Sequence, residues 1–331
     1  MSTRRVGIIG AGFMAGVHAA AWTAVGHTPA AILGRTADSA ARLAAEFGAA
    51  PFTDLDAFMH AVDIVDICTP THLHAEFALA AAAARKPTLC EKPLSLSVGE
   101  GRRVVDAFES AGIPLQVGHI LRFTAEYVVA RNQVAAGAIG HPAVVRLSRL
   151  SFAPRREGGS WFEDENKSGG IPFDLMIHDL DYARWVAGDV ASVYAKSAFN
   201  SLGHVVAVLK HTSGTISHIE SSWSLPAPEF KTRFEIAGAA GILSFASEDT
   251  TTLKVRLHEE PSVGNTGLGD TELAANPFEA EMRSFLNVLD GTAEPVLTSA
   301  DAVAAVQLAA AVITSARTGK PVDLTPIREV R

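Results

Sequence analysis

Short apolar runs recur along the first part of the chain, and a stretch with helical spacing follows most of them. The runs lie at residues 5–9, 29–33, 63–68, 88–90 and 114–117, with a shorter one near Pro51. Amphipathic or alanine-rich stretches separate them, for example 38–47, 55–60 and 98–111. Strands that alternate with helices form a doubly wound parallel sheet, whose ligands lie outside the carboxyl ends of the strands. We therefore predict an α/β domain over residues 1–120.

The pattern changes near residue 143 to strand-like runs separated by turn residues. These runs lie at residues 144–150, 192–199, 205–209, 215–221, 230–236, 242–245 and 252–257. Two of the joints, 212–214 and 238–241, are typical of hairpins. We predict that residues 121–331 form an α+β domain for substrate binding and oligomerisation, built on a large, mainly antiparallel open sheet. Helices after Asn276 and from Ala300 are expected to pack back toward the first domain.

An open sheet of this size has edges and an exposed face that helices or a second subunit must cover. We therefore expect a homodimer or homotetramer.

Composition narrows the function. The 331 residues are 48% hydrophobic, which is enough for two cores, and the net charge is −8. This charge offers no basic field for nucleic acid or anionic lipid, so a small molecule is the expected partner. The alanine-rich runs are too short and too interrupted to predict a membrane segment. Cys68 and Cys90 each end an apolar run and are predicted to be buried packing residues of a cytoplasmic protein.

A glycine-rich turn follows the first predicted strand. It begins Gly10-Ala11-Gly12, and Phe13, Met14 and Ala15 open the helix that comes after it. Gly10 permits the tight turn, Gly12 lets the backbone approach a pyrophosphate, and Ala15 lets helix and strand pack closely. With a strand before it and a helix after it, this turn predicts a Rossmann dinucleotide-binding domain.

The second strand ends without the acid that holds the adenosine ribose of NAD. Gly34, Arg35 and Thr36 stand there instead, and the last two could hold a 2′-phosphate by charge-assisted hydrogen bonds. NADP is the preferred prediction for the cofactor. NAD stays open, with Arg35 stacked on the adenine. An aspartate at Gly34 is expected to shift preference toward NAD.

Two further strand exits carry polar residues to the same edge of the predicted sheet. Thr69, Pro70, His72 and His74 follow one strand, and Glu91 and Lys92 follow the next. No third metal ligand accompanies the two histidines, so we predict cofactor contacts here and no metal. Lys92, at a strand exit before a proline, is the candidate for acid/base chemistry.

A glycine pair at 169–170 precedes a helical pattern with polar positions at Asp174, His178 and Asp181. Positions i, i+4 and i+7 share one face of a helix, so Asp174 is expected to orient the His178 imidazole and stabilise its charged form. This arrangement suits proton transfer.

Together these segments resemble the glucose-fructose oxidoreductase, inositol dehydrogenase and rhizopine catabolism superfamily, usually called Gfo/Idh/MocA. The resemblance covers nearly the whole chain and is carried by Gly10-x-Gly12-x-x-Ala15-x-x-His18, Thr69-Pro70-x-x-x-His74, Glu91-Lys92-Pro93, Gly118-His119-x-x-Arg122-Phe123 and Gly169-Gly170-x-x-x-Asp174-x-x-x-His178-Asp179-x-Asp181. It implies a Rossmann domain, a sheet domain used for oligomerisation, and catalytic roles for Lys92, Asp174 and His178. Met176 stands where the family often has glycine, and Gly34 stands where it often has an acid.

The predicted function is an NAD(P)-dependent oxidoreductase that transfers hydride between nicotinamide and a secondary alcohol or carbonyl of a sugar or polyol. His119, Arg122, Trp161 and Asn166 are the expected substrate contacts, with Arg155 and Arg156 in the same polar loop as the last two. Two alternatives stay open: a noncatalytic dinucleotide-sensing regulator, and a glycosidase that uses nicotinamide for transient oxidation.

Overall fold

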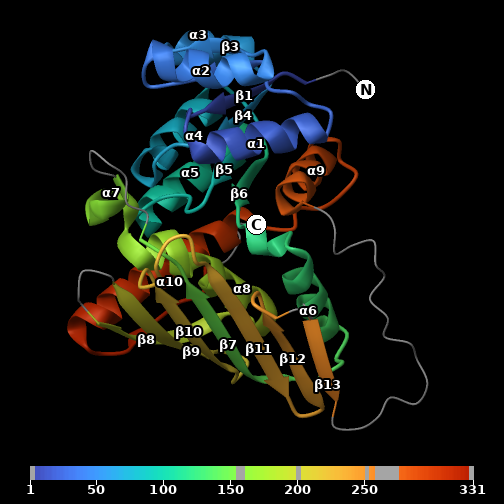
Figure 1. Ribbon diagram of the computed structural model, residues 1–331, viewed down its shortest axis with the longest axis vertical. Helices are drawn as coiled ribbons and strands as arrows, with labels where there is room; N and C mark the ends of the chain where they lie inside the picture. The colour runs from blue at the N-terminus through green and yellow to red at the C-terminus, as the bar shows by residue number, and fades with distance from the viewer. Residues whose placement is uncertain (1–3, 154–160, 199–202, 250–252, 258–275, 328–331) are drawn as a thin grey trace. The chain divides into compact units, whose positions relative to one another are not determined.

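The computed structural model describes residues 4–153, 161–198, 203–249, 253–257 and 276–327, and the chain forms two compact units (Figure 1). One unit combines residues 1–123 with 276–303, and the other combines 124–275 with 304–330. The predicted division near residue 120 lies close to the end of the first segment. The return of residues 276–303 to the first unit has a physical cause, which is the apolar face of the helix that they contain.

The first unit is built on a six-stranded sheet with the order β3-β2-β1-β4-β5-β6. All its neighbouring strands pair in parallel. The strands are β1 (Val6–Ile9), β2 (Ala31–Leu33), β3 (Ala50–Phe52), β4 (Ile64–Ile67), β5 (Thr88–Glu91) and β6 (Leu115–Gly118). This order is that of the doubly wound Rossmann fold, so the predicted fold class is confirmed for this unit.

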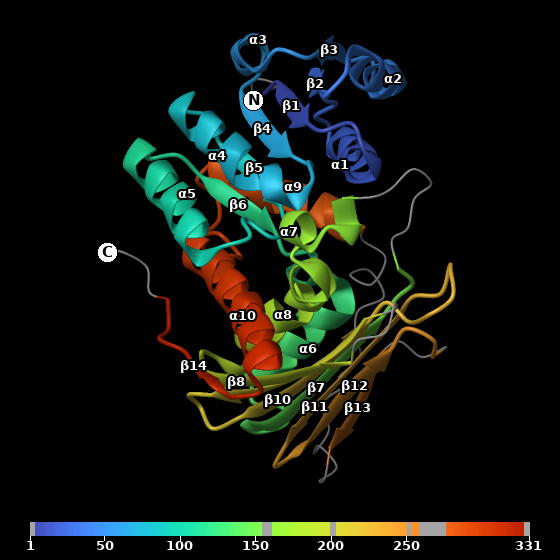
Figure 2. The same cartoon turned by 90° about the vertical axis from the view of Figure 1, so that its left-hand side faces the viewer.

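Helices cover both faces of this sheet. They are α1 (Phe13–Ala24), α2 (Ala37–Phe47), α3 (Leu55–Ala61), α4 (His74–Ala83), α5 (Val98–Ala111) and α9 (Pro277–Leu289), with short 3₁₀ turns at Thr71–Leu73 and Ile120–Arg122. Figure 2 shows α4 and α5 side by side on one face and α1 on the other. Met282 and Phe285 of α9 are fully buried in one apolar cluster with Trp22 of α1 and Leu89 of β5. This cluster holds α9 in the first unit.

Sequence signals at the helix ends explain where these helices begin. The side chains of Thr36, Asp54, Ser97 and Asn276 each accept a hydrogen bond from a backbone N–H in the first turn of the helix that follows. Such caps satisfy amide groups that have no partner within the helix. The helix α1 differs, because its cap position is a glycine without a capping side chain.

The second unit contains an eight-stranded sheet with the order β13-β12-β11-β7-β10-β9-β8-β14. The strands are β7 (Pro142–Leu150), β8 (Val190–Ala198), β9 (His204–His211), β10 (Ile216–Ser222), β11 (Lys231–Gly238), β12 (Gly241–Ala246), β13 (Leu253–Leu257) and β14 (Val322–Asp323). Neighbours pair antiparallel except β7 and β10, which are parallel. The predicted large, mainly antiparallel sheet is therefore confirmed, and both predicted hairpins are present.

The helices of the second unit lie on one face of its sheet (Figure 2). They are α6 (Ala125–Ala135), α8 (Ile177–Ala187) and the later part of α10 (Ser299–Thr318), with a short α7 (Glu165–Ser168), a 3₁₀ turn at Trp161–Glu163 and a π-helical turn at Pro172–Met176.

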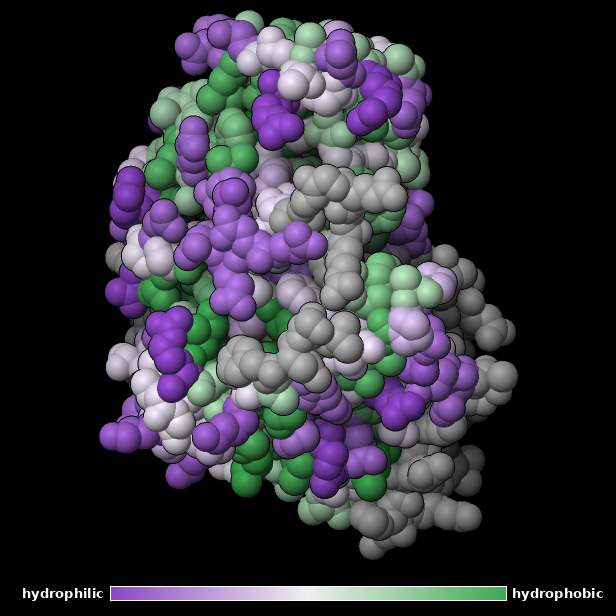
Figure 3. Space-filling model, turned by 60° about the vertical axis from the view of Figure 1, so that its left-hand side comes forward, coloured by the Kyte–Doolittle hydropathy of each residue, from purple (hydrophilic) through white to green (hydrophobic). Residues whose placement is uncertain are grey.

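α10 is long and apolar enough to cross a membrane, but 56% of its most apolar window is buried in the protein. A buried core helix meets the same test, so this is weak evidence for a span. Hydrophilic and hydrophobic residues are interspersed over the face that Figure 3 shows.

The opposite face of the second sheet carries charged pairs and a few exposed apolar side chains. Tyr194, Val208 and Ile216 are more than a third exposed on β8, β9 and β10. A cavity of about 380 Å³ lies on the same face and is lined by Arg146 of β7 and Glu235 of β11, among others. Alternation along the strands explains this, because every second side chain points away from the helices.

Candidate functional site

The exits of neighbouring strands bring most of the predicted cofactor residues to one edge of the first sheet. β1, β4 and β5 are adjacent and parallel, and their ends are in register. Gly10 follows β1, Thr69 comes shortly after β4, and Lys92 follows β5. This is the carboxyl edge, where open α/β sheets bind ligands.

The glycine turn has the geometry that a dinucleotide requires. Gly10 has φ of 120°, and a Cβ there would lie 2.4 Å from the carbonyl oxygen of Cys68, so a side chain is excluded. A Cβ at Gly12 would instead meet no atom within 4 Å. Because no side chain caps α1, the amides of its first turn and its positive dipole are available to an anion. Phe13 is 73% exposed beside them, and Met14 is partly buried. These features fit a pyrophosphate.

The end of β2 has no room for the acid that an NAD enzyme uses there. Gly34 is buried, and a Cβ on it would lie 2.8 Å from the amide nitrogen of Ala40 and 2.9 Å from Ser39 Oγ. The Thr36 hydroxyl is used in the cap of α2, where it accepts from the Ser39 amide and donates to Ser39 Oγ. Arg35 is exposed. An aspartate at Gly34 would therefore displace the first turn of α2, and the expected shift toward NAD stays a prediction.

His74 links two of the strand exits. Its Nδ1 lies 2.7 Å from the carbonyl oxygen of Pro93, and its Nε2 lies 2.8 Å from that of Thr69. Burial lowers the pKa of His74, so the ring is neutral and donates to one of the two carbonyls. Both ring nitrogens of His74 therefore face backbone carbonyls of the protein. Nearby, His72 is exposed and Pro70 is partly buried, while Thr69 Oγ1 is buried and has no partner among the described residues.

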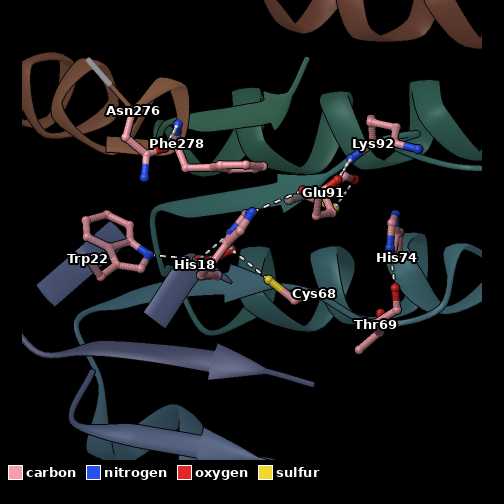
Figure 4. Close-up of polar contacts among 11 residues, drawn as sticks. His18, Trp22, Cys68, Thr69, His74, Glu91, Lys92, Asn276 and Phe278 are labelled. Carbon is pink, nitrogen blue, oxygen red and sulfur yellow. Dashed lines mark hydrogen bonds and ion pairs between the residues drawn. The ribbon is translucent and has the colours of Figure 1, made fainter. Parts of the chain in front are cut away.

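A network of buried charges lies behind Lys92 (Figure 4). His18 of α1 is fully buried, with Nδ1 2.9 Å from Asp66 Oδ2 and Nε2 3.0 Å from Glu91 Oε1. The other oxygen of Glu91 accepts a hydrogen bond from the backbone N–H of Lys92 at 3.0 Å. Burial opposes charge on His18, but the Asp66 carboxylate outweighs it and holds the pKa of the imidazole well above its usual range. Both oxygens of Glu91 thus have partners within the protein.

The same network contains the possible metal ligands found among the described residues. His18, Asp66 and Cys68 place possible ligand atoms within 4.8 Å of one another. The Trp22 indole also donates to Asp66 Oδ2, at 2.8 Å, and the Cys68 thiol lies 3.6 Å from Asp66 Oδ1. Asp66 is therefore saturated by donors, and burial raises the pKa of the Cys68 thiol far above its usual range. The cluster is a hydrogen-bonded network, and both cysteines are free and buried as expected.

A second buried acid lies close to this network. Glu281 of α9 is fully buried, and no residue within the described ranges donates a hydrogen bond to either of its oxygens. Burial raises the pKa of this carboxyl well above its usual value. The Phe278 ring of the same helix lies 5.6 Å from the His18 ring.

In the second unit, Asp174 and His178 come from different helical geometries. Asp174 lies in the π-helical turn and His178 in the first turn of α8. Both are partly exposed, whereas Asp181 is only 1% exposed. The π turn changes the spacing between Asp174 and the residues of α8, whereas His178 and Asp181 lie three positions apart on that same α-helix. π turns are frequent at functional sites.

The helix that carries His178 is held by an ion pair. Arg149 of β7 donates to both oxygens of Asp179, from Nε at 2.7 Å and Nη2 at 3.1 Å. Asp179 is fully buried and Arg149 is 5% exposed. This contact joins the start of α8 to the sheet.

The predicted substrate residues lie in different environments. Trp161 stacks on Phe162 with ring centroids 3.8 Å apart, and Asn166 is exposed on α7. His119 is buried, and the Arg122 guanidinium donates to the Val296 carbonyl and to Asp301, each at 3.0 Å, within the first unit. Arg122 therefore has a structural ion pair. Arg155 and Arg156 lie outside the described residues.

Sequence reasoning missed roles for Trp22, Asp66 and Glu281. The sequence contains features that could have indicated these roles. Asp66 interrupts an otherwise apolar strand, Trp22 lies one turn beyond His18, and Glu281 stands among the core positions of α9 beside Phe278 and Met282. A polar residue at a core position indicates a buried partner or a function.

Comparisons with known proteins cover both units. A model described as an oxidoreductase family with an NAD-binding Rossmann fold, GFO/IDH/MocA, matches residues 4–119. The model of the GFO/IDH/MocA C-terminal domain matches residues 127–244.

Several characterised enzymes are similar to this chain. 1,5-Anhydro-D-fructose reductase of Ensifer adhaerens is 30% identical over 277 residues, which cover 80% of each chain. Inositol 2-dehydrogenase of Rhizobium meliloti is 30% identical over 335 residues, 95% of this chain and 97% of that enzyme. Among solved structures, GenD2 from gentamicin A biosynthesis in complex with NAD has a TM-score of 0.84 and 26% identity, over 98% of this chain and 97% of that one.

Proposed function

Because the chain belongs to the Gfo/Idh/MocA oxidoreductase family, we propose that it oxidises a secondary alcohol of a sugar or polyol, or reduces the matching carbonyl. A nicotinamide dinucleotide is the proposed hydride carrier.

One observation carries the proposal most directly. Lys92 leaves β5 at the edge where Gly10 and Gly12 form the anion site, in a sheet whose β1, β4 and β5 are adjacent. A lysine beside a bound nicotinamide is suited to contact the oxygen of a reacting alcohol, since its ammonium donates hydrogen bonds and can exchange a proton. The glycine turn without Lys92 would support dinucleotide binding alone.

We assign the proton chemistry to three residues. A bound oxidised nicotinamide would be the acceptor for the hydride that leaves the carbinol carbon. His178 accepts the hydroxyl proton, Asp174 orients the imidazole and stabilises its charged form, and Lys92 hydrogen-bonds the same oxygen. In the direction of reduction the same groups return the proton. The partial exposure of Asp174 and His178 supports these roles, because a proton-transfer group must reach its substrate.

The substrate class rests on the relatives. Their names include an anhydro-sugar reductase and inositol dehydrogenases. Trp161, whose ring stacks on Phe162, supplies an aromatic surface for a sugar face, and the exposed Asn166 supplies hydrogen bonds for hydroxyl groups. A cyclic polyol or sugar is the proposed substrate.

NADP is the proposed preference over NAD. Two observations support it. The buried Gly34 leaves no space for an acid that would hold a ribose and repel a phosphate, and Arg35 is exposed at the start of α2. A guanidinium there can pair with a 2′-phosphate.

We also propose a homo-oligomer, formed through the outward face of the second sheet. The exposed Tyr194, Val208 and Ile216 support this, because a partner would cover them. Light scattering during gel filtration measures the mass of the assembly, and Ile216→Lys is expected to weaken it. A monomeric parent protein would refute the oligomer.

A reducing, cytoplasmic location is also proposed. The buried free thiols are in keeping with it.

The function is tested by mixing the protein with NAD or NADP and a panel of sugars and polyols while nicotinamide absorbance is followed. Turnover with a cyclic polyol or sugar is expected, faster with NADP. Dinucleotide binding by calorimetry, without turnover of any panel member in either direction, would favour the sensing regulator instead.

A further inference from the structure

The carboxylate of Glu91 joins the cofactor-binding helix to the backbone of Lys92. Glu91 Oε1 lies 3.0 Å from His18 Nε2, and Oε2 accepts from the Lys92 N–H at 3.0 Å (Figure 4). The Glu91 side chain is 11% exposed and that of His18 is 0% exposed. Water therefore has little access to these bonds.

His18 is itself held from both sides. Its Nδ1 faces both oxygens of Asp66, at 2.9 and 3.1 Å, and its Nε2 faces Glu91. A carboxylate only accepts hydrogen bonds, so both ring nitrogens must carry hydrogen for both contacts to be bonds. The imidazole is therefore charged, and each contact is a charge-assisted bond of the stronger kind. Trp22, one turn further along α1, donates to the same aspartate.

We propose that Glu91, clamped by the His18 imidazolium, is a positioning residue that fixes the backbone of Lys92 and so sets the place of its amine. Three elements meet in this contact. His18 lies on α1, whose first turn forms the anion site, Asp66 lies on β4, and Glu91 ends β5. The inference rests on the proposed role of Lys92, but its central bond can be measured without any turnover.

Other titratable groups near His18 do not replace this bond. Cys68, just after β4, is a buried thiol, and Glu281 on α9 is a buried carboxyl without a described donor. Neither has a described hydrogen bond to Glu91. Glu281→Gln is therefore a matched control, because it alters a buried acid in the same core but leaves the contact between Glu91 and Lys92 intact.

The experiment measures hydrogen exchange of the Lys92 backbone amide by NMR, together with kcat and the Kd of the dinucleotide. Glu91→Gln keeps the shape of the side chain. Its amide nitrogen would face either His18 Nε2 or the Lys92 N–H, and because both are donors, one of the two hydrogen bonds must be lost. We expect exchange at Lys92 to rise at least about tenfold and kcat to fall at least about tenfold, with the dinucleotide Kd unchanged within about twofold. Glu281→Gln should change none of the three.

Other variants and outcomes keep the test decisive. His18→Phe removes both bonds to Glu91 and Asp66, and should raise exchange at Lys92 even though residue 92 is unaltered; if it does not fold, Glu91→Gln still decides. Unchanged Lys92 exchange in Glu91→Gln overturns the inference. Faster exchange with unaltered kcat also overturns it, since the backbone would then move without consequence. Faster exchange in a protein that turns over no substrate would refute the proposed function but would still support the role of Glu91 in holding the Lys92 backbone.

Discussion

Arg149 and Asp179 form a two-point ion pair inside the second unit, with N–O distances of 2.7 and 3.1 Å. Asp179 directly follows His178, so this pair holds the part of α8 that carries the proposed proton acceptor.

Asp179→Ala would leave the Arg149 guanidinium buried without its partner. We expect a loss of about 3–5 kcal/mol in the free energy of unfolding, measured by urea denaturation, because breaking one side of a buried pair leaves an uncompensated charge. The double variant Arg149→Met with Asp179→Leu should recover most of that loss. Arg146→Ala, on the same strand, removes an exposed pair with Glu235 and should cost less than about 1 kcal/mol. Equal losses for Asp179→Ala and Arg146→Ala would contradict this reasoning.

Lys92→Met and His178→Ala should each lower kcat by roughly a hundredfold or more, since acid/base groups contribute factors of that size. The Kd of the dinucleotide should stay nearly constant. If both groups act on one proton, the double variant will lose less than the product of the single effects. Parent-like kcat in both single variants would refute the catalytic assignment.

Arg35→Ala should weaken NADP binding about tenfold or more and leave NAD binding nearly unchanged, because only the 2′-phosphate needs the guanidinium. Calorimetric titration with both dinucleotides measures this. Thr36→Ser, which keeps the hydroxyl cap of α2, is the control and should preserve affinity for both. A parent protein that binds NAD much more tightly than NADP would refute the proposed role of Arg35.

Gly34→Asp should lower the thermal stability of the protein, whatever its effect on cofactor preference. Its Cβ would lie 2.8 Å from the Ala40 amide nitrogen, so the first turn of α2 must shift. We expect a fall in the thermal midpoint of several degrees, a size typical of about 1–3 kcal/mol of steric strain. A fully stable variant with a clean preference for NAD would show that α2 moves freely.

Glu281→Gln should stabilise the protein, and by more as the pH rises. Burial holds the folded-state pKa of Glu281 well above the ordinary 4.5, so folding keeps this proton while the unfolded chain loses it above pH 4.5. The parent therefore loses stability as pH increases from 4.5 toward the folded-state pKa, and glutamine removes that loss. We expect near-equal midpoints at pH 4.5 and a gain of about 1–3 kcal/mol at pH 8. A gain independent of pH would mean that the carboxyl is not protonated in the folded chain.

Patterns local in sequence determined most of the secondary structure. Alternation of apolar strands and helical stretches predicted the parallel sheet, and Gly10 with Gly12 predicted the anion site, because turn geometry and helix spacing depend on residues close in the chain. Lys92 could be placed at the carboxyl edge for the same reason, since every strand of a doubly wound parallel sheet points the same way. The strand runs after residue 143 likewise predicted a large sheet.

Tertiary structure alone decided the contacts that join distant segments. The sequence contains His18, Asp66 and Glu91 on three separate elements, and only packing brings their side chains within 3.1 Å. The parallel pairing of β7 with β10 and the return of α9 to the first unit also depend on which apolar faces cover each other. The burial of Asp181 on α8 likewise depends on the packing of that helix. Burial is a property of the whole fold. Whether a buried ionisable group is paired, like His18, or has its pKa raised, like Glu281, therefore depends on residues that local patterns do not specify.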